Sequence, residues 1–175
     1  MNIPGIFVQN LIVEAVPILL FFLFLFRLGK NFQTEMYLKI TGKMQKCTVG
    51  ILGGILLALA LWCLVTKADK VTVLYNLLYY TVFIAFAEEF VVRGVCVYLV
   101  RGEKPYIRYL APNLLFAVMH LFSYANWGAI TVPYVISFVS SELLGLLTMG
   151  CIFQFLKEKS GTLWTAVLVH AILVQ

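Results

Sequence analysis

Charged residues are scarce in this chain of 175 residues: Asp, Glu, Lys and Arg make up 12% of it, whereas 62% of its residues are apolar or aromatic. Soluble domains average about 25% charged and about 45–50% apolar residues. A water-soluble globule of this size leaves about a third of its chain surface exposed, so it could not hide this much apolar area. Disorder is excluded for the same reason. The composition therefore indicates an integral membrane protein.

Cysteine is also sparse, and the chain has no CxxC pair, which excludes a disulfide scaffold. We expect the thiols to be free and to pack within the apolar segments; they are Cys47, Cys63, Cys96 and Cys151. The N-terminus lacks a basic leader and an A-x-A cleavage site, so the first apolar run is expected to be a retained span. The net charge of +5 does not indicate nucleic acid binding, because the Lys and Arg residues fall between apolar runs.

Long apolar runs dominate what is present. A helix needs about 20 apolar residues to cross a hydrocarbon core about 30 Å thick. Runs bounded by charged residues, or by the break at Asn126-Trp127-Gly128, predict spans at 6–26, 47–66, 71–100, 109–125, 129–156 and 161–175. The expected fold is all-α, a polytopic helical bundle with about six transmembrane helices.

The cations predict the orientation of this bundle. Of the 13 Lys and Arg residues, ten lie in the first, third and fifth loops and two in the second and fourth. Cytoplasmic loops carry the excess of Lys and Arg, so we expect both termini outside and the odd loops in the cytoplasm. The remaining cation, Arg93, lies inside a predicted span.

Three ionisable residues lie within six positions of the third span: Glu88, Glu89 and Arg93. Each charge at mid-bilayer costs about 2.5–3.5 kcal/mol on insertion scales, so such groups are usually paired and functional. Glu89 and Arg93 are four residues apart and can pair on one helix face. Glu88 is rotated by about 100° from Glu89 and is therefore free to face another group.

Both histidines of the chain lie in predicted spans at the depth of Glu88. Glu88 is 13 residues from Arg101, His120 is 12 from Arg108, and His170 is 11 from Lys159. A rise of 1.5 Å per residue places all three roughly 16–20 Å from the cytoplasmic end of their helices. Three helices should therefore bring carboxylates and imidazoles to one level, although a packing role for each histidine alone remains open.

A carboxylate with two imidazoles at that level favours an activated water that attacks an amide. Zinc held by Glu88, His120 and His170 is an alternative, although the H-E-x-x-H motif is absent. Movement of protons or ions is a third reading, but paired broken helices, which are usual in such proteins, are missing.

Other residues are expected to serve packing. Glu142 lies inside a span and is expected to bond to nearby hydroxyls such as those of Ser140 and Ser141. Glu14 is expected at the outer interface. Small residues let helices approach closely, which is the role expected for the glycines at 50, 53, 54, 145 and 150.

Three segments resemble the motifs of the CPBP intramembrane proteases, a group that includes CAAX prenyl endopeptidases and bacteriocin-processing or immunity (Abi) proteins. Residues 88–93 fit EExxxR, residues 116–120 fit FxxxH, and residues 161–171 resemble the segment around HxxxN/D. The resemblance covers about residues 83–175. It divides the chain into N-terminal membrane helices with a cytoplasmic loop (1–80) and a CPBP-like catalytic helical core (81–175).

The resemblance implies an intramembrane endopeptidase that hydrolyses a peptide bond in a membrane-associated or small peptide. It implies that Glu88 activates water, that Glu89 and Arg93 support it, that His120 orients the water and that His170 stabilises the oxyanion. No cofactor is expected, with Zn²⁺ as the alternative. The expected partners are a peptide or lipidated peptide and the bilayer, without nucleic acid, and residue usage favours a bacterial plasma membrane.

One position departs from the family pattern. Val174 stands where the third motif has Asn or Asp, four residues after His170, and Val has no donor. Loss of one oxyanion donor costs about 10²–10³ in rate. Asn113, on the face of His120, is a distant candidate for a replacement donor. The alternative is a weak or inactive relative that acts as an immunity or partner-binding membrane protein.

Overall fold

The computed structural model describes residues 15–123 and 130–174, and these form helices with no strand. The all-α class predicted from the sequence is confirmed for this part of the chain. The α-helices are α2 (Ala15–Leu28), α3 (Phe32–Glu35), α4 (Lys43–Thr66), α5 (Lys70–Leu78), α6 (Ala87–Glu89), α7 (Val97–Leu99), α8 (Pro105–Ser123), α9 (Val132–Ser141), α10 (Leu143–Ser160) and α11 (Leu163–Val174). A 3₁₀ turn, η1 (Gly29–Asn31), and two π-helical segments, η2 (Tyr79–Phe86) and η3 (Phe90–Cys96), complete them.

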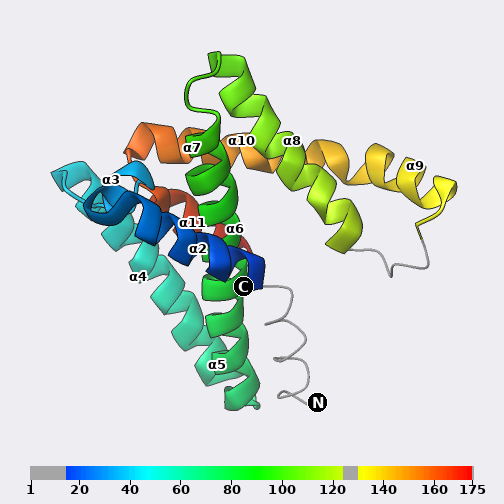
Figure 1. Ribbon diagram of the computed structural model, residues 1–175. Helices are drawn as coiled ribbons and strands as arrows, with labels where there is room; N and C mark the ends of the chain where they lie inside the picture. The colour runs from blue at the N-terminus through cyan, green and yellow to red at the C-terminus, as the bar shows by residue number, and fades with distance from the viewer. Residues whose placement is uncertain (1–14, 124–129, 175) are drawn as a thin grey trace.

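One helical course runs without interruption from α5 to α7 through η2, α6 and η3, as Figure 1 shows. It corresponds to the predicted span 71–100 and carries the EExxxR motif. The motif begins in the single turn of α6, which lies between the two π-helical segments. Because π-helical turns are frequent at functional sites, this interruption of regular α-helix makes the segment around Glu88 and Glu89 a candidate site.

The six predicted spans are confirmed only in part. By length and composition, two stretches can cross a membrane: Ala15–Glu35 and Lys43–Thr66. Helices α9 and α10 give a third if they are counted as one bent span, and α11 is apolar but shorter. The N-terminal half of the span predicted at 6–26, with Glu14, lies outside the described residues, as do residues 124–129.

The predicted span 129–156 is not one straight helix. It breaks at Glu142, and α9 and α10 meet there with a bend of 45°. The Ser140 and Ser141 hydroxyls donate to the Ser137 carbonyl oxygen, at 3.0 and 2.8 Å. Such bonds compete with the helical backbone and bend helices. Because both hydroxyls donate to the Ser137 carbonyl oxygen, the expected bond from them to Glu142 is wrong, and Glu142 is exposed.

Packing brings the C-terminal half of the chain around the long helical course. Helix α10 crosses α8, and α11 lies against α4, η2 and α10 (Figure 1). The turn between α10 and α11 is made by Gly161, whose φ of +69° is a left-handed conformation that favours glycine. Its N–H donates to the Lys157 carbonyl oxygen at 2.8 Å, which closes the last turn of α10.

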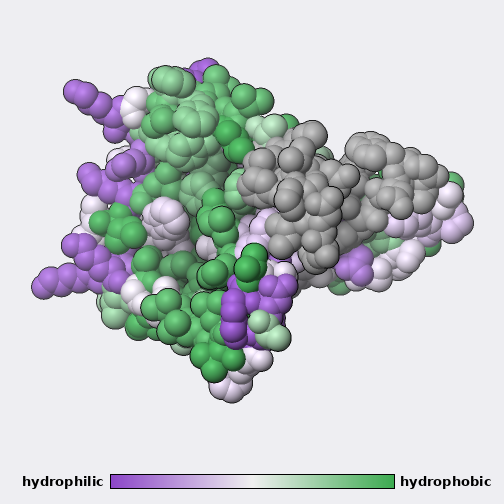
Figure 2. Space-filling view, turned by 90° about the horizontal axis from the view of Figure 1, so that it is seen from below, coloured by the Kyte–Doolittle hydropathy of each residue, from purple (hydrophilic) through white to green (hydrophobic). Residues whose placement is uncertain are grey.

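The outer surface is apolar. Figure 2 shows hydrophobic residues over much of the coloured surface, while hydrophilic side chains project mainly from one edge. Large side chains such as Phe26 and Trp62 are 82% and 68% exposed. Apolar area on this scale is unusual for a soluble monomer and fits contact with lipid.

Candidate active site

Glu89 and Arg93 form the centre of the site. Both side chains are fully buried, and Arg93 Nη1 donates to Glu89 Oε1 at 3.1 Å. Four residues separate them, so the pair predicted from helical spacing is confirmed. Buried charges of this kind are stable only when they are paired, because taking each ion out of water costs several kcal/mol.

His170 reaches the same carboxylate from α11. Its Nδ1–H donates to Glu89 Oε1 at 3.0 Å, so one oxygen accepts from both Arg93 and His170. The imidazole also stacks on the Phe153 ring, with centroids 4.9 Å apart and an interplanar angle of 16°. The ring is therefore held by a hydrogen bond at one nitrogen and by an aromatic face.

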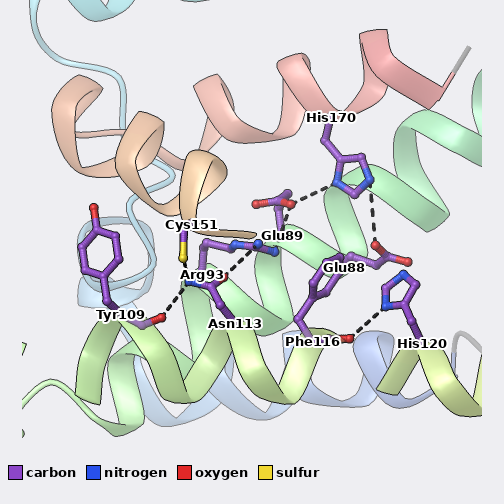
Figure 3. Close-up of polar contacts among 9 residues, drawn as sticks. All are labelled: Glu88, Glu89, Arg93, Tyr109, Asn113, Phe116, His120, Cys151 and His170. Atoms are coloured by element: carbon purple, nitrogen blue, oxygen red, sulfur yellow. Dashed lines mark hydrogen bonds and ion pairs between the residues drawn. The ribbon is translucent and has the colours of Figure 1, made fainter. Parts of the chain in front are cut away.

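Glu88 points to the other side of the helical turn. Its side chain is 30% exposed, and Glu88 Oε2 lies 3.9 Å from His170 Nε2. That separation is too long for a direct hydrogen bond. Figure 3 shows the Glu88 carboxylate between the imidazoles of His170 and His120. Of the two neighbouring glutamates, Glu88 is the one that solvent or a substrate can reach.

His120 approaches Glu88 from α8. Its Nδ1–H donates to the carbonyl oxygen of Phe116 at 2.8 Å, one turn earlier on the same helix. In the neutral ring this bond places the lone pair on Nε2. The Phe116 ring meets the imidazole edge-on at 4.4 Å.

The Arg93 side chain is held on its far side by α8. Asn113 Oδ1 accepts from Arg93 Nη2 at 3.1 Å, while Asn113 Nδ2 donates to the Tyr109 carbonyl oxygen at 2.7 Å and lies 3.9 Å from Cys151 Sγ. The Phe116 ring covers the guanidinium at 4.8 Å. The expectation that Asn113 could serve as an oxyanion donor is wrong, because both ends of its amide are already engaged.

Two further residues contribute to the cluster, and the first of them, Lys157, was not found from the sequence. Lys157 was counted among loop cations, yet it is 2% exposed and donates to the Arg93 carbonyl oxygen at 2.8 Å. Its Nζ also lies 4.1 Å from the centroid of the Tyr37 ring. Because Lys157 stands at the end of an apolar run, only its contact across 64 residues reveals that it is buried.

Gly150 is the second such residue. A Cβ there would stand 2.7 Å from Asn113 Oδ1 and 3.1 Å from Arg93 Nη2, so only glycine leaves room for their bond. Close approach was expected for several glycines, and it is confirmed at Gly150. It is wrong for the others when tested against the described residues, since a Cβ would meet nothing within 4 Å at Gly50, Gly53, Gly54 and Gly145.

The described residues give no support to a metal-binding set. Within 15–123 and 130–174, no group of three His, Cys, Asp or Glu side chains is arranged to hold a metal ion. The zinc alternative named Glu88, His120 and His170, which all lie in this part of the chain. The four cysteines are free, as expected.

The structure thus brings Glu88, Glu89, Arg93 and His170 into contact and places His120 beside them (Figure 3). Val174 closes α11 one turn after His170 and offers no hydrogen-bond donor. A carboxylate that is accessible, between two imidazoles and next to a buried ion pair, has the groups needed for general acid–base chemistry on a bound water.

Apolar helices around a buried Glu–His–Arg cluster define a class of membrane-embedded proteins with a polar site inside the bundle. Residues 70–174 match the family described as type II CAAX prenyl endopeptidase Rce1-like. Because the match covers more than half of the chain, the protein belongs to this family of membrane proteases, in agreement with the motif resemblance. No curated protein and no solved structure matches the chain.

Proposed function

We propose that this protein is an intramembrane endopeptidase in which Glu88 activates water for attack on a peptide bond. The observation that carries the proposal is the convergence of four side chains from three helices: Glu88 and Glu89 from α6, His120 from α8 and His170 from α11. The bond of His170 to Glu89 and the position of the Glu88 carboxylate between the two imidazoles support a shared function better than separate packing roles.

The first step follows from the hydrogen bonds of the site. A water between Glu88 and His120 gives one proton to the Glu88 carboxylate and donates its other hydrogen to the Nε2 lone pair of His120. The water oxygen forms a bond to the scissile carbonyl carbon, and the carbonyl electron pair moves to its oxygen. His120 Nδ1 donates to the Phe116 carbonyl oxygen, so we assign this role to the other ring nitrogen, Nε2.

The second step consumes that intermediate. The oxyanion accepts a hydrogen bond from the Nε2–H of His170, which in this scheme carries a proton on each ring nitrogen from the start and neither gains nor loses one, while its Nδ1–H remains bonded to Glu89. The tetrahedral carbon re-forms its carbonyl, the C–N bond breaks, and Glu88 returns its proton to the leaving amine. One water is consumed, and one carboxyl and one amine product are formed.

Glu89 and Arg93 act behind the reacting groups. Glu89 Oε1, which accepts from both Arg93 and His170, holds the His170 ring in place while the oxyanion exists. Both are fully buried, so neither reaches a substrate directly. This division assigns chemistry to Glu88, His120 and His170 and orientation to the ion pair.

The protein we propose is a multi-pass protein of a bacterial plasma membrane. The substrate we propose is the C-terminal region of a lipidated peptide in that bilayer. The family description names a prenyl endopeptidase, and a site among apolar helices favours a substrate that arrives from the lipid. A peptide carrying an apolar chain partitions into the bilayer and so reaches such a site. We propose no cofactor for this reaction.

The experiment is cleavage of a farnesylated CAAX peptide by the purified protein in proteoliposomes. Glu88→Gln should lower kcat by at least about 10²-fold, because it removes the base. Glu142→Gln is the matched control, since Glu142 is an exposed span carboxylate away from the site, and it should leave kcat unchanged. Equal kcat for wild type and Glu88→Gln would falsify the mechanism.

A second candidate function rests on Val174. A chain without the donor of the third motif could have lost catalysis and kept a role as an immunity or partner-binding membrane protein. In that case Glu88→Gln would leave the biological activity of the protein intact, and the wild type would cleave none of the peptides offered.

A further inference from the structure

The carboxamide of Asn113 occupies a decisive place in the buried cluster. Arg93 reaches Glu89 with Nη1 and Asn113 with Nη2, each at 3.1 Å, and among the described residues no other hydrogen bond from Nη2 is present. Glu89 Oε1 then accepts from both Arg93 and His170. The direction of the guanidinium therefore determines where Glu89 points, and Glu89 determines the orientation of the His170 ring.

Asn113 can occupy only one orientation. Its Nδ2 donates to the Tyr109 carbonyl oxygen at 2.7 Å, which leaves Oδ1 for Arg93. A flipped amide would set an NH₂ group against the guanidinium and a carbonyl oxygen against another carbonyl oxygen. Asn113 is 1% exposed, so water could not repair either contact.

The fit of Asn113 against α10 is tight. Gly150 lies opposite the bond, and a Cβ there would be 2.7 Å from Asn113 Oδ1. Arg93 Nε and Glu89 Oε2 are buried and make no hydrogen bond among the described residues. The ion pair is thus not fully satisfied by itself, and Asn113 supplies a neutral acceptor without a competing charge.

We propose that Asn113 is a positioning residue. It fixes the orientation of Arg93, which holds Glu89, and Glu89 in turn orients the His170 ring toward the reacting groups. The proposal rests on the proposed function for its catalytic consequence, but its structural content is independent of it. Asn113 touches neither a reacting atom nor a substrate, so it acts through the chain of bonds from Arg93 to Glu89 to His170.

Two variants of Asn113 test this role. Asn113→Leu removes the acceptor with little change in size, and it should lower kcat about 10-fold or more with little change in KM, because substrate contacts are kept. Asn113→Asp restores an acceptor but competes with Glu89 for Arg93, so it should recover part of kcat with a displaced pH–rate profile. Asn76→Leu removes an amide in α5 and is the matched control.

A readout without catalysis separates this proposal from the proposed function. The ¹⁵N chemical shifts of the His170 ring in nanodiscs should change in Asn113→Leu and stay unchanged in Asn76→Leu. Unchanged His170 shifts in a folded Asn113→Leu protein would overturn the positioning role, whatever the activity. If the His170 shifts change in Asn113→Leu while the wild-type protein cleaves no peptide, the positioning role is supported and the proposed protease function is rejected.

An independent observation concerns two adjacent cavities beside α2, away from the residues that form the ion-pair cluster. The first, of about 200 Å³, is lined only by apolar side chains of α2 and the central span, including Phe22, Phe83 and Phe90. The second, of about 910 Å³, lies between the 29–40 segment and Trp164. Phe21 and Phe86 line both, so the two cavities are adjacent, and together they are called the groove below.

The wider cavity carries positive charge. Lys30 and Lys39 line it with Gln33, and no carboxylate does. Neither lysine forms an ion pair or a side-chain hydrogen bond with the described residues, whereas Glu35 nearby pairs with Arg101 at 2.9 Å. An apolar slot that opens into a basic mouth matches a molecule with a hydrocarbon chain and an anionic head.

We infer that this groove binds an anionic phospholipid, with an acyl chain among the phenylalanines and the phosphate at Lys30 and Lys39. The segment that carries both lysines is predicted to be cytoplasmic, and basic pockets on that side of a membrane bind anionic lipid head groups. Two unpaired cations without a carboxylate favour this lipid over a zwitterionic one.

Native mass spectrometry of the purified protein with equimolar phosphatidylglycerol and phosphatidylcholine tests the site. The wild type should retain phosphatidylglycerol preferentially, and Lys30→Gln/Lys39→Gln should lose that preference. Lys43→Gln/Lys46→Gln, which changes two exposed lysines outside the groove, should keep it.

Equal retention of both lipids by the wild type, or equal loss in both double variants, would overturn the assignment. Displacement of the lipid by inorganic phosphate would point to a phosphate site without a chain, and displacement by the farnesylated peptide would point to a substrate groove; either result also overturns it.

Discussion

At the scale of single residues, buried polar side chains hold the centre of the bundle. Glu89, Arg93 and Asn113 are each at most 1% exposed, and His170 is 7% exposed. Each is satisfied mainly by the others, so removal of one partner leaves an uncompensated group in an apolar interior. Breaking a buried ion pair in this way typically costs about 3–5 kcal/mol.

Gly150 is expected to be intolerant of a single methyl group. Gly150→Ala would press its Cβ against Asn113 Oδ1 and Arg93 Nη2, and overpacking of this kind costs about 1–3 kcal/mol. Thermal unfolding in detergent measures the change. Gly145→Ala on the same helix meets nothing within 4 Å and should be neutral or stabilising. Equal melting temperatures for the two variants would contradict this account of the cluster.

Val174 is expected to limit the rate. Val174→Asn places a donor one turn after His170, on the same face of α11, and should raise kcat by up to about 10²-fold through stabilisation of the oxyanion. Peptide cleavage in proteoliposomes measures it, with Val174→Leu as the control that changes size alone. A rise with both variants, or with neither, would show that the added amide does not reach the oxyanion.

At the scale of elements, the ends and bends of helices position the site. The 45° bend between α9 and α10 turns α10 across α8, where Gly150 and Cys151 meet Asn113. Gly161 then reverses the chain into α11, which carries His170 back to α6. The bend and the turn between helices therefore bring Glu88, His120 and His170 together, in addition to the depth of each residue within its own helix.

The cap of α5 is expected to give a pH-dependent stability. Asp69 accepts from the Thr72 backbone N–H at 3.0 Å, and this bond lowers the pKa of the Asp69 carboxyl. A carboxyl with a lowered pKa in the folded state stabilises the fold above its unfolded pKa and loses that effect as the pH falls through its folded pKa. The melting temperature should therefore drop on acidification through that window.

Asp69→Ala separates this contribution from that of other carboxyls. The variant should be less stable than wild type at neutral pH, and the difference should shrink in acid, where the wild-type cap is protonated. A difference that stays constant from neutral to acidic pH would show that the Asp69 carboxylate does not support the cap.

At the scale of the whole molecule, the exterior is apolar and the centre is polar. Side chains such as Trp62 and Phe26 are exposed, while Glu89 and Arg93 are buried. Figure 2 shows that hydrophobic residues cover much of the coloured surface. The bilayer therefore solvates the exterior, and within the site the Glu88 side chain, which is 30% exposed, is the carboxylate that remains accessible.

The complete protein is expected to work without a bound metal. Treatment with EDTA or phenanthroline should leave the cleavage rate unchanged, since Glu88 would supply the base and the described residues form no metal-binding group. The rate and the metal content of the same sample, by elemental mass spectrometry, check this together. Loss of cleavage that added Zn²⁺ restores would establish the zinc alternative instead.

The sequence by itself determined what depends on composition and on neighbours along the chain. Scarce charge and long apolar runs gave the membrane class, and the four-residue spacing of Glu89 and Arg93 gave their ion pair. Such features are local, because hydropathy acts over a window and helical contacts over one turn. The depth argument likewise grouped His120 and His170 with Glu88.

Only the tertiary structure decided the contacts between helices. The bond of Asn113 to Arg93 joins residues 20 apart, and those of His170 to Glu89 and Lys157 to the Arg93 carbonyl join residues 81 and 64 apart. No periodicity encodes which faces meet, because rotation and bending of each helix depend on packing against its neighbours. For that reason Asn113 and Lys157 could not be assigned before the bundle was assembled.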